Sequence, residues 1–349
     1  MREAHPQRFL GIQALRMIAA CLVVLTHSTQ YVFDRLDKNF LVWTQGTRGV
    51  DVFFVISGFV MVYSSQKLLE IPDGWKMFAE NRVQRIVPLY WMVTTLKACI
   101  MLFTVGLTLH AILSPATVVC SYLFLPAKNL DGKIEPLVAV GWTLNFEMLF
   151  YLIFTIALFL RANVLKFVGI TLTLLSVGAY FRHPAWPPIA FFLNTIVLEF
   201  FFGMLIANAC INGIYISKKY AYFLLACGFV LLLFPSTDWN LLRFLISGVP
   251  AALIVWSTAS LRTMDDSIPR WILYLGDASY AIYLIHPFVC PFPPTVLNRL
   301  HIDSPLLSVV LSVALGLGAG CIIHQFLERP LTNRLKSYSK MRQRLLQTA

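Results

Sequence analysis

Charged residues are scarce in this sequence. They make up 13% of its 349 residues, whereas hydrophobic residues make up 58%. A soluble globular chain carries roughly a quarter of charged residues, so this composition excludes an ordinary soluble domain. Acidic residues are fewer than basic ones. The chain has 17 Asp and Glu and 28 Lys and Arg, which gives a formal net charge of +11. The composition therefore indicates a chain whose main solvent is lipid.

Metal-binding motifs are also lacking. No CxxC pair and no HExxH segment occurs, so we expect neither a zinc site nor another metal site. The cysteines lie within or at the edges of apolar stretches, and we interpret them as small core residues rather than a disulfide framework. They are Cys21, Cys99, Cys120, Cys210, Cys227, Cys290 and Cys321. Five histidines are interpreted as ordinary boundary residues: His5, His110, His183, His301 and His324.

Internal repeats, low-complexity tracts and a cleavable signal peptide are not evident. Arg16 interrupts the first apolar stretch and no small-residue cleavage site follows, so we expect this stretch to remain as a membrane span. The simplest organisation is one membrane-embedded domain over 1–349, with a core at about 8–331 and a basic cytoplasmic tail at 332–349.

Long apolar runs recur along the whole chain. A spanning helix needs about 20 mostly apolar residues, and an all-α polytopic membrane protein with about ten transmembrane helices is therefore predicted. The expected spans are 10–30, 49–66, 86–107, 140–160, 164–182, 188–210, 219–236, 240–260, 271–291 and 304–327. Residues 109–127 are shorter and contain Pro115, so we predict a short or re-entrant segment there.

The basic residues lie between the spans and in the tail, which argues against nucleic-acid binding and instead sets the topology. Lys and Arg gather on alternate connections, so both termini are predicted to be cytoplasmic. The connections expected outside are 31–48, 128–139, 183–187, 237–239 and 292–303. All are short, so no soluble outer domain is expected.

Arg16 and His27 occupy one apolar helix. At about 100° per residue, eleven residues bring the two side chains to within about 20° of each other, some 16 Å apart along the axis. Arg16 would then lie in the cytoplasmic half and His27 near the outer end. Ionisable groups inside a bilayer are functional candidates by default. The alternative is that Arg16 reaches the inner headgroups and His27 only marks the outer boundary.

Other polar side chains also fall inside expected spans. Glu147, in WTLNFEMLFY, needs a partner such as His27 or Arg16, or else is neutral and bonded to a neighbouring helix. Glu199 and Lys97 are expected to neutralise each other as a structural pair.

Two groups of side chains share a helix face by their spacing. Ser279, Tyr283 and His286 form a polar stripe that either lines a cavity, as candidate substrate contacts, or joins helices. Arg82 and Arg85, just before an expected span, are positioned to hold phosphates, or serve topology alone.

Six segments, taken together and in order, resemble the integral-membrane acyltransferase family 3, and within it the bacterial exopolysaccharide acetyltransferases. They are ALRMIAACLVVLTH, GVDVFFVISGFVM, NRVQRIVPLYW, VGWTLNFEMLFYL, LGDASYAIYLIHPF and LERPL, and they span about residues 8–331. The resemblance implies a multi-pass protein of the bacterial cytoplasmic membrane. It also implies transfer of an acyl group, with acetyl favoured, from cytoplasmic acyl-coenzyme A to a saccharide hydroxyl, on an exopolysaccharide or a lipid-linked precursor.

The resemblance also suggests roles for the charged residues. The family's essential Arg and His correspond to Arg16 and His27. We expect His27 to act as general base, with an acyl-histidine intermediate as the alternative. Glu147 would orient His27. Arg16 would bind pantetheine or polarise the thioester, while Arg82 and Arg85 would bind the phosphates of acetyl-coenzyme A.

At the expected outer end of the second span, Asp51 is a candidate contact for the sugar, while Ser57 and Gly58 are expected to permit close helix packing. Two alternatives remain open. One keeps the chemistry with a succinyl donor. The other is a saccharide transporter or flippase, which the absence of matched, interrupted helices in the two halves disfavours.

Overall fold

The computed structural model describes residues 9–103, 114–129, 132–183, 185–234, 241–261 and 267–348. Within these ranges the chain is a bundle of helices, and its strand-like pairing is limited to one isolated bridge between Lys128 and Ile134. The α-helices of the described residues are α1 Leu10–Arg35, α2 Gly49–Ser65, α3 Gly74–Phe103, α4 Pro115–Tyr122, α5 Trp142–Phe159, α6 Val164–Gly178, α7 Leu198–Ile211, α8 Lys218–Leu233, α9 Val249–Ser260, α10 Arg270–Val289, α11 Phe292–Arg299, α12 Pro305–Ile323 and α13 Arg329–Thr348.

Seven helical segments in the described part of the chain are long and apolar enough to cross a membrane. Each contains or overlaps one of the predicted spans, which confirms an all-helical, multi-pass fold. They are Leu10–Arg35, Gln45–Glu70, Gly74–Phe103, Ala139–Phe159, Val164–Phe181, Arg270–Arg299 and Pro305–Ser339.

The other three predicted spans are helical but shorter. They correspond to Thr195–Ile211, α8 and Phe244–Ser260. At 1.5 Å per residue, a helix of 17 residues is about 25 Å long, less than the hydrocarbon thickness of about 30 Å. The first is shortened because a 3-10 turn, Pro188–Phe192, replaces its expected start. The count of ten spans stays a prediction.

Helix α3 corrects one predicted boundary. It begins at Gly74 rather than near residue 86, so Arg82 and Arg85 lie well inside the helix instead of preceding it. The apolar run begins near residue 86, but the more polar residues 74–85 before it are helical as well. Pro88 lies within the helix, after these two arginines. The predicted end at 104–107 lies outside the described residues, as do His5 and His110.

The predicted short segment 109–127 contains a short helix. Helix α4 has eight residues, and the chain then turns at Phe124, whose φ is 56°. Eight residues extend about 12 Å, so α4 does not cross a bilayer. Residues 109–113 lie outside the described part.

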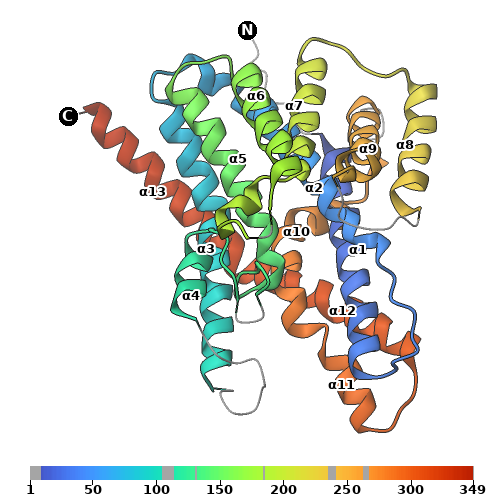
Figure 1. Cartoon of the computed structure of the whole chain (residues 1–349). Coiled ribbons are helices and arrows are strands. Elements are labelled where there is room, and N and C mark those ends of the chain that lie inside the picture. Colours follow the sequence, from blue (N-terminus) through green and yellow to red (C-terminus); the bar gives the residue numbers. More distant parts are fainter. Residues whose placement is uncertain are drawn as a thin grey trace.

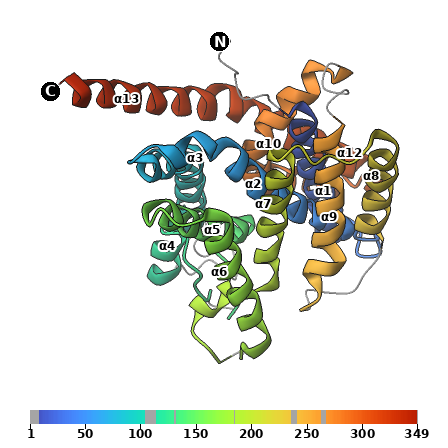
Figure 2. The same ribbon diagram turned by 90° about the horizontal axis from the view of Figure 1, so that it is seen from above.

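Helices α1, α2 and α10 supply residues of the candidate site described below, and Figures 1 and 2 show how they are arranged in the bundle. Helix α1 packs against both α2 and α10, α2 against α7, α10 against α12, and α3 against α5. Helix α13, which corresponds to the predicted basic tail, runs outward from the bundle to the C-terminal end in both views.

The backbones of α2 and α7 touch at two glycines. A Cβ atom at Gly58 would collide with the carbonyl oxygen of Phe200, and one at Gly203 would collide with that of Val55. Close approach of this kind is typical of small residues at membrane helix interfaces. The prediction that Gly58 permits close helix packing is confirmed.

Two predicted outer connections, 31–48 and 292–303, meet at one end of the bundle. Arg35 donates to Thr295 Oγ1 at 2.9 Å, and Asn298 donates to the carbonyl of Arg35 at 2.9 Å. Arg48 donates to the carbonyl of Phe234 at 2.7 Å, and this contact lies beside the middle of α1, because the neighbouring Gly46 and Gly49 pack against the carbonyls of Leu22 and Ala19. Which end faces the cytoplasm stays a prediction.

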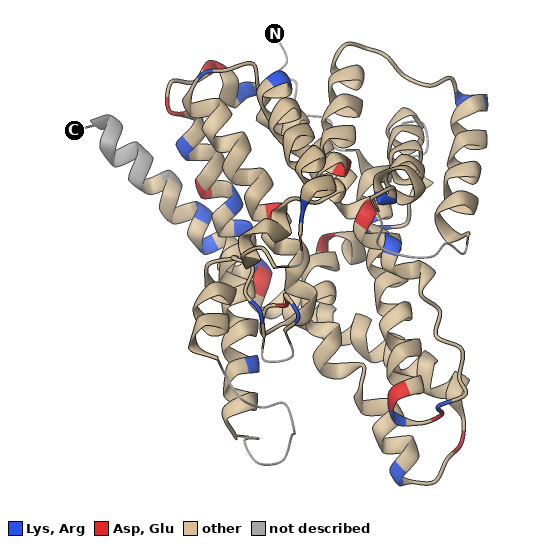
Figure 3. Cartoon of the chain, viewed as in Figure 1, with Lys and Arg blue, Asp and Glu red and all other residues tan. Residues whose placement is uncertain are grey.

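Charged residues are sparse over the described helices (Figure 3). They gather near helix ends and in the interior, and long stretches of helix surface carry none. A surface of this kind is suited to contact with lipid.

We expect Gly58→Ala and Gly203→Ala each to destabilise the protein, because the added methyl group must push two helix backbones apart. Overpacking of this kind costs about 1–3 kcal/mol. Thermal unfolding of detergent-purified protein measures the loss. The control is Gly318→Ala on α12, where a Cβ atom has no atom within 4 Å. Equal melting temperatures for all three variants would show that the α2–α7 interface accommodates a methyl group without loss of stability.

Candidate active site

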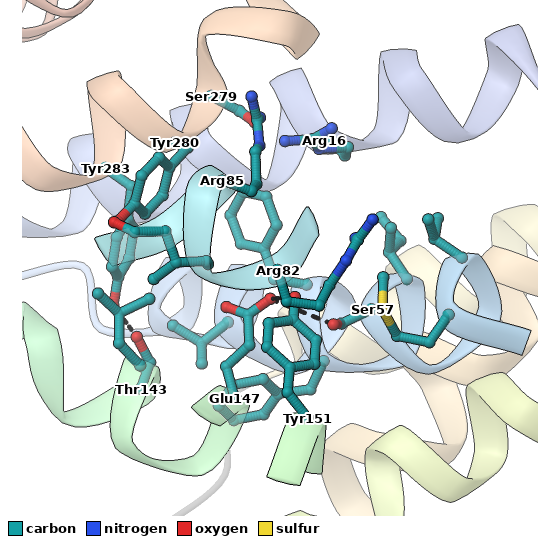
Figure 4. A pocket seen from close by; sticks show the side chains of 18 residues that line it. Arg16, Ser57, Arg82, Arg85, Thr143, Glu147, Tyr151, Ser279, Tyr280 and Tyr283 are labelled. Atoms are coloured by element: carbon teal, nitrogen blue, oxygen red, sulfur yellow. Dashed lines mark hydrogen bonds between the residues drawn. The ribbon is translucent and has the colours of Figure 1, made fainter. Parts of the chain in front are cut away.

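A pocket of about 140 Å³ lies between α1, α2, α3, α5 and α10. Its apolar wall includes Val50, Phe53 and Phe54. Ten of its lining residues carry polar groups: Arg16, Ser57, Arg82, Arg85, Thr143, Glu147, Tyr151, Ser279, Tyr280 and Tyr283 (Figure 4). The sequence predicted six of these as site residues, and the structure brings all six to one cavity: Arg16, Arg82, Arg85, Glu147, Ser279 and Tyr283.

Three arginines give the pocket a cationic side. Arg16 comes from α1, and Arg85 lies close enough for the two positive charges to repel each other. Arg82 stands 5.8 Å from the Phe78 ring and 6.0 Å from the Tyr151 ring. Its Nε atom is buried and has no hydrogen-bond partner. A guanidinium with a buried, unused donor is suited to hold an anion.

Arg85 differs from Arg82 in having a carboxylate partner. Its Nη1 atom lies 2.8 Å from Glu328 Oε1, and Glu328 Oε2 lies 2.7 Å from His324 Nδ1. Glu328 and His324 belong to a π-helical turn, His324–Glu328, between α12 and α13, and both are buried. The interpretation of His324 as a boundary residue is therefore wrong.

Glu147 faces the pocket from α5. It accepts hydrogen bonds from Ser57 Oγ, at 3.2 Å, and from the hydroxyl of Tyr151, one helical turn further along α5 (Figure 4). No hydrogen bond joins Glu147 to His27 among the described residues. The expected pairing with His27 is thus not seen, whereas Arg16, the other expected partner, lines the same pocket and lies within electrostatic range of Glu147.

His27 instead contacts His286. His27 Nδ1 and His286 Nε2 are 3.0 Å apart, and the two ring centroids are separated by 4.9 Å. The pair lies between α1 and α10, beyond the lining of the pocket. The ring of Tyr283, which does line the pocket, stands 6.0 Å from the His286 ring. Tyr283 therefore lies between the pocket and the two imidazoles.

The polar stripe on α10 contributes side chains both to the pocket and to the pair of imidazoles. Ser279 and Tyr283 face the pocket, and the Tyr283 hydroxyl donates to the carbonyl of Val140 at 2.9 Å and lies 3.0 Å from Thr143 Oγ1. Ser279 is fully buried and its hydroxyl has no partner. His286, at the C-terminal end of the stripe, faces α1 instead. The stripe thus both lines a cavity and joins helices.

Asp51 lies away from the pocket. It is fully buried and receives two hydrogen bonds from Arg243, at 3.0 and 2.8 Å. Glu199 is also fully buried and lies within electrostatic range of Asp51 and Arg243. The expected pair of Glu199 with Lys97 is wrong, because Glu199 belongs to this group on α2, α7 and the turn before α9.

Sequence reasoning gave no role to Thr143, Tyr151, Tyr280, Arg243 and Glu328, and it assigned Ser57 only to helix packing. Two signals were available. Arg243 is a charge inside an apolar stretch, which calls for a buried partner. Glu328 belongs to LERPL, a segment that contributed to the family resemblance but received no role. The two tyrosines carry no such signal, since aromatic residues are common throughout these helices.

Comparison with known proteins bears on the chemistry. A family model described as an acyltransferase domain matches residues 9–325. The chain is similar to the exopolysaccharide production protein ExoZ of Rhizobium meliloti (strain 1021), with 33% identity over 315 residues that cover 87% of this chain and 95% of ExoZ.

Two further relatives are more distant or partial. Protein 2 in the picA locus of Rhizobium radiobacter is 31% identical over 163 residues, which cover 42% of this chain and 81% of that protein. YrhL of Bacillus subtilis (strain 168), whose name marks it as a candidate peptidoglycan O-acetyltransferase, is 23% identical over 97% of this chain and 57% of YrhL. No solved structure matches the chain.

Asp51→Asn should destabilise the protein strongly, because it removes the negative charge of the group that accepts two hydrogen bonds from the buried guanidinium of Arg243. Breaking a buried ion pair costs about 3–5 kcal/mol, which thermal unfolding in detergent would detect. The matched control is Asp73→Asn, which breaks an exposed pair with Lys76 and should cost less than about 1 kcal/mol. Wild-type stability of Asp51→Asn, combined with a raised KM for the acceptor, would instead assign Asp51 to sugar binding.

Proposed function

Because the chain belongs to the integral-membrane acyltransferase family 3, we propose that it transfers an acetyl group from cytoplasmic acetyl-coenzyme A to a hydroxyl group of an exported or cell-surface saccharide. The observation that carries this proposal is the cationic pocket between the helices, together with the pair of imidazoles next to its lining residue Tyr283. An anionic donor and a base that accepts a hydroxyl proton are the two requirements of such a transfer.

The donor end of the site is the arginine side of the pocket. Coenzyme A carries phosphate groups, and arginine binds phosphate through charge-assisted hydrogen bonds. Arg82 is the strongest candidate, since its buried Nε atom has no partner. Arg85 already shares its charge with Glu328, so we assign it a weaker share of phosphate binding. Arg16 lies on the helix that also carries His27 and would contact the pantetheine arm or the thioester.

His27 is the proposed general base. It would take the proton of the sugar hydroxyl as the hydroxyl oxygen attacks the thioester carbonyl. The carbon–oxygen bond forms, the carbon–sulfur bond breaks, and the proton is returned to the leaving thiolate. Imidazole is suited to both steps near neutral pH.

Glu147 is proposed to shape the donor pocket rather than to orient His27. Its bonds to Ser57 and Tyr151 tie α2 and α5 together at the side of the cavity. A carboxylate in this position also disfavours a donor whose acyl group carries its own negative charge. This argument favours acetyl over succinyl.

The acceptor is proposed to be a bacterial polysaccharide or its lipid-linked precursor. The name of ExoZ refers to exopolysaccharide production and that of YrhL to peptidoglycan. Both names point to carbohydrate outside the cytoplasm. The protein would accordingly lie in the cytoplasmic membrane, with its donor pocket open to the inside and the acceptor outside.

We expect His27→Ala to reduce transfer by roughly 10² to 10⁴-fold, the range for loss of a general base. Inside-out membrane vesicles would receive labelled acetyl-coenzyme A on their cytoplasmic face, and label in lumenal saccharide would be counted. The matched control is His183→Ala, which removes an exposed histidine. Transfer from labelled succinyl-coenzyme A but not from acetyl-coenzyme A would identify succinyl-coenzyme A as the donor instead. No transfer from either donor by folded wild-type protein, in vesicles that contain acceptor, would refute the proposed reaction.

Arg82→Ala should raise the KM for acetyl-coenzyme A while leaving kcat nearly unchanged, because it removes a phosphate contact far from the reacting bond. A charge-assisted hydrogen bond contributes about 1.5–3 kcal/mol, which corresponds to roughly a 10 to 100-fold increase in KM. Lys76→Ala, which removes an exposed cation from the same helix, serves as control and should leave KM unchanged. An unaltered KM in Arg82→Ala would assign Arg82 to membrane topology.

A further inference from the structure

His27 and His286 form a buried pair whose hydrogen bonds define where the protons lie. His286 is fully buried on α10, and His27 is half-buried on α1. His286 Nδ1 lies 3.3 Å from the carbonyl oxygen of Ile282. His27 Nδ1 lies 3.1 Å from the carbonyl oxygen of Val23 and 3.0 Å from His286 Nε2. If both imidazoles are neutral, each ring carries one N–H hydrogen. Two hydrogens must then serve these three short contacts.

One arrangement of protons satisfies all three contacts. Carbonyl oxygens only accept, so His286 Nδ1 carries a hydrogen directed at Ile282 and its Nε2 atom is a bare acceptor. His27 Nδ1 then carries the hydrogen that both the Val23 carbonyl and His286 Nε2 accept. The reverse arrangement, with the proton on His286 Nε2, would set a bare nitrogen against each of the two carbonyl oxygens. This second arrangement keeps the hydrogen bond between the rings and loses the other two.

We infer that His286 is a positioning residue, which holds His27 as the Nδ1–H tautomer and so leaves His27 Nε2 as the nitrogen that accepts the hydroxyl proton. The chemical part of this inference rests on the proposed acetyl transfer, whereas the proton assignment follows from the two rings alone. All hydrogen bonds that the described residues make to His27 involve Nδ1, which agrees with an Nε2 atom kept for the substrate.

The assignment gives a balanced sequence of proton steps. His27 Nε2 takes the proton of the sugar hydroxyl as the oxygen attacks the thioester carbon. The imidazolium that results keeps its Nδ1–H bond to His286 Nε2, which stabilises the positive charge. His27 Nε2 then gives its proton to the sulfur as the carbon–sulfur bond breaks. His286 occupies the place that a carboxylate holds in serine hydrolases, but as a neutral acceptor.

The packing of three helices keeps the two rings in register. Gly276 on α10 lies against the backbone of Gln13 on α1, and the Gln13 side chain donates to Asp277. Behind the pair, Gly316 of α12 would bring a Cβ atom to 3.5 Å from the Cβ atom of His286. The absence of a side chain there lets α12 close over His286. Such fixed surroundings are what a positioning residue needs.

The experiment compares His286→Gln with His286→Leu. Glutamine retains an oxygen that can accept from His27 Nδ1, whereas leucine fills the space without an acceptor. In the vesicle assay we expect His286→Leu to lose kcat by roughly 10²-fold, the effect of misplacing a reacting group, with the KM for acetyl-coenzyme A within about twofold of wild type. His286→Gln should regain at least tenfold of that loss. Equal kcat in wild type and His286→Leu would overturn the inference.

A second measurement reads the tautomer directly and does not depend on activity. Nitrogen-15 NMR of histidine-labelled protein in lipid nanodiscs distinguishes Nδ1–H from Nε2–H, and His27→Ala identifies the His27 signals. We expect Nδ1–H in the wild type and a mixture of tautomers in His286→Leu. An Nε2–H signal for wild-type His27 would overturn the proton assignment. A correct tautomer in a protein without acetyl transfer would instead refute only the proposed function.

Where His286→Leu fails to fold, His286→Gln and His286→Asn provide the comparison. Both carry an amide, but the shorter asparagine withdraws its oxygen from His27. We then expect kcat to fall in His286→Asn below that of His286→Gln at equal thermal stability. Equal kcat values for these two amides would overturn the positioning role.

Discussion

An ionised side chain inside an apolar helix bundle is stable only beside an opposite charge, a hydrogen-bond partner or water. This constraint divides the interior charges of the protein into two kinds. Asp51 and Arg243 neutralise each other in a buried, doubly hydrogen-bonded pair, as expected of groups that hold helices together. Arg82 is half-buried and lines a cavity, and its buried Nε atom has no hydrogen-bond partner. An unused donor of this kind is suited to bind an anion.

Arg85 combines features of both kinds, because it lines the pocket and also pairs with a carboxylate. Its bond to Glu328 connects the donor pocket to the π-helical turn that precedes α13, and His324 completes the group. A single-turn π-helix often occurs at functional sites. Here one carboxylate oxygen of Glu328 contacts Arg85 and the other contacts the imidazole of His324. Arg85 is therefore held in the pocket by residues about 240 positions away in the sequence.

The sequence predicts well what depends on a single helix. The positions of the apolar helices, the shared face of Arg16 and His27, and the close packing at Gly58 all follow from the period of one helix or from the size of one residue. It does not reveal which helix lies opposite. His27 has His286 as its neighbour, not Glu147, and Glu199 lies near Arg243, not Lys97. Helical periodicity fixes the direction of a side chain relative to its own axis, whereas the partner depends on how separate helices pack.

Two helices carry both ends of the candidate site. Arg16 and His27 belong to α1, while Ser279, Tyr283 and His286 belong to α10. The distance from the arginine-lined pocket to His27, the proposed base, is therefore set by residue counts within single helices. Insertions or deletions in the connecting loops would leave this distance intact, whereas one residue inserted between Arg16 and His27 would rotate the imidazole by about 100°. During evolution, the loops can accordingly diverge to suit new saccharides while the chemistry is inherited unchanged.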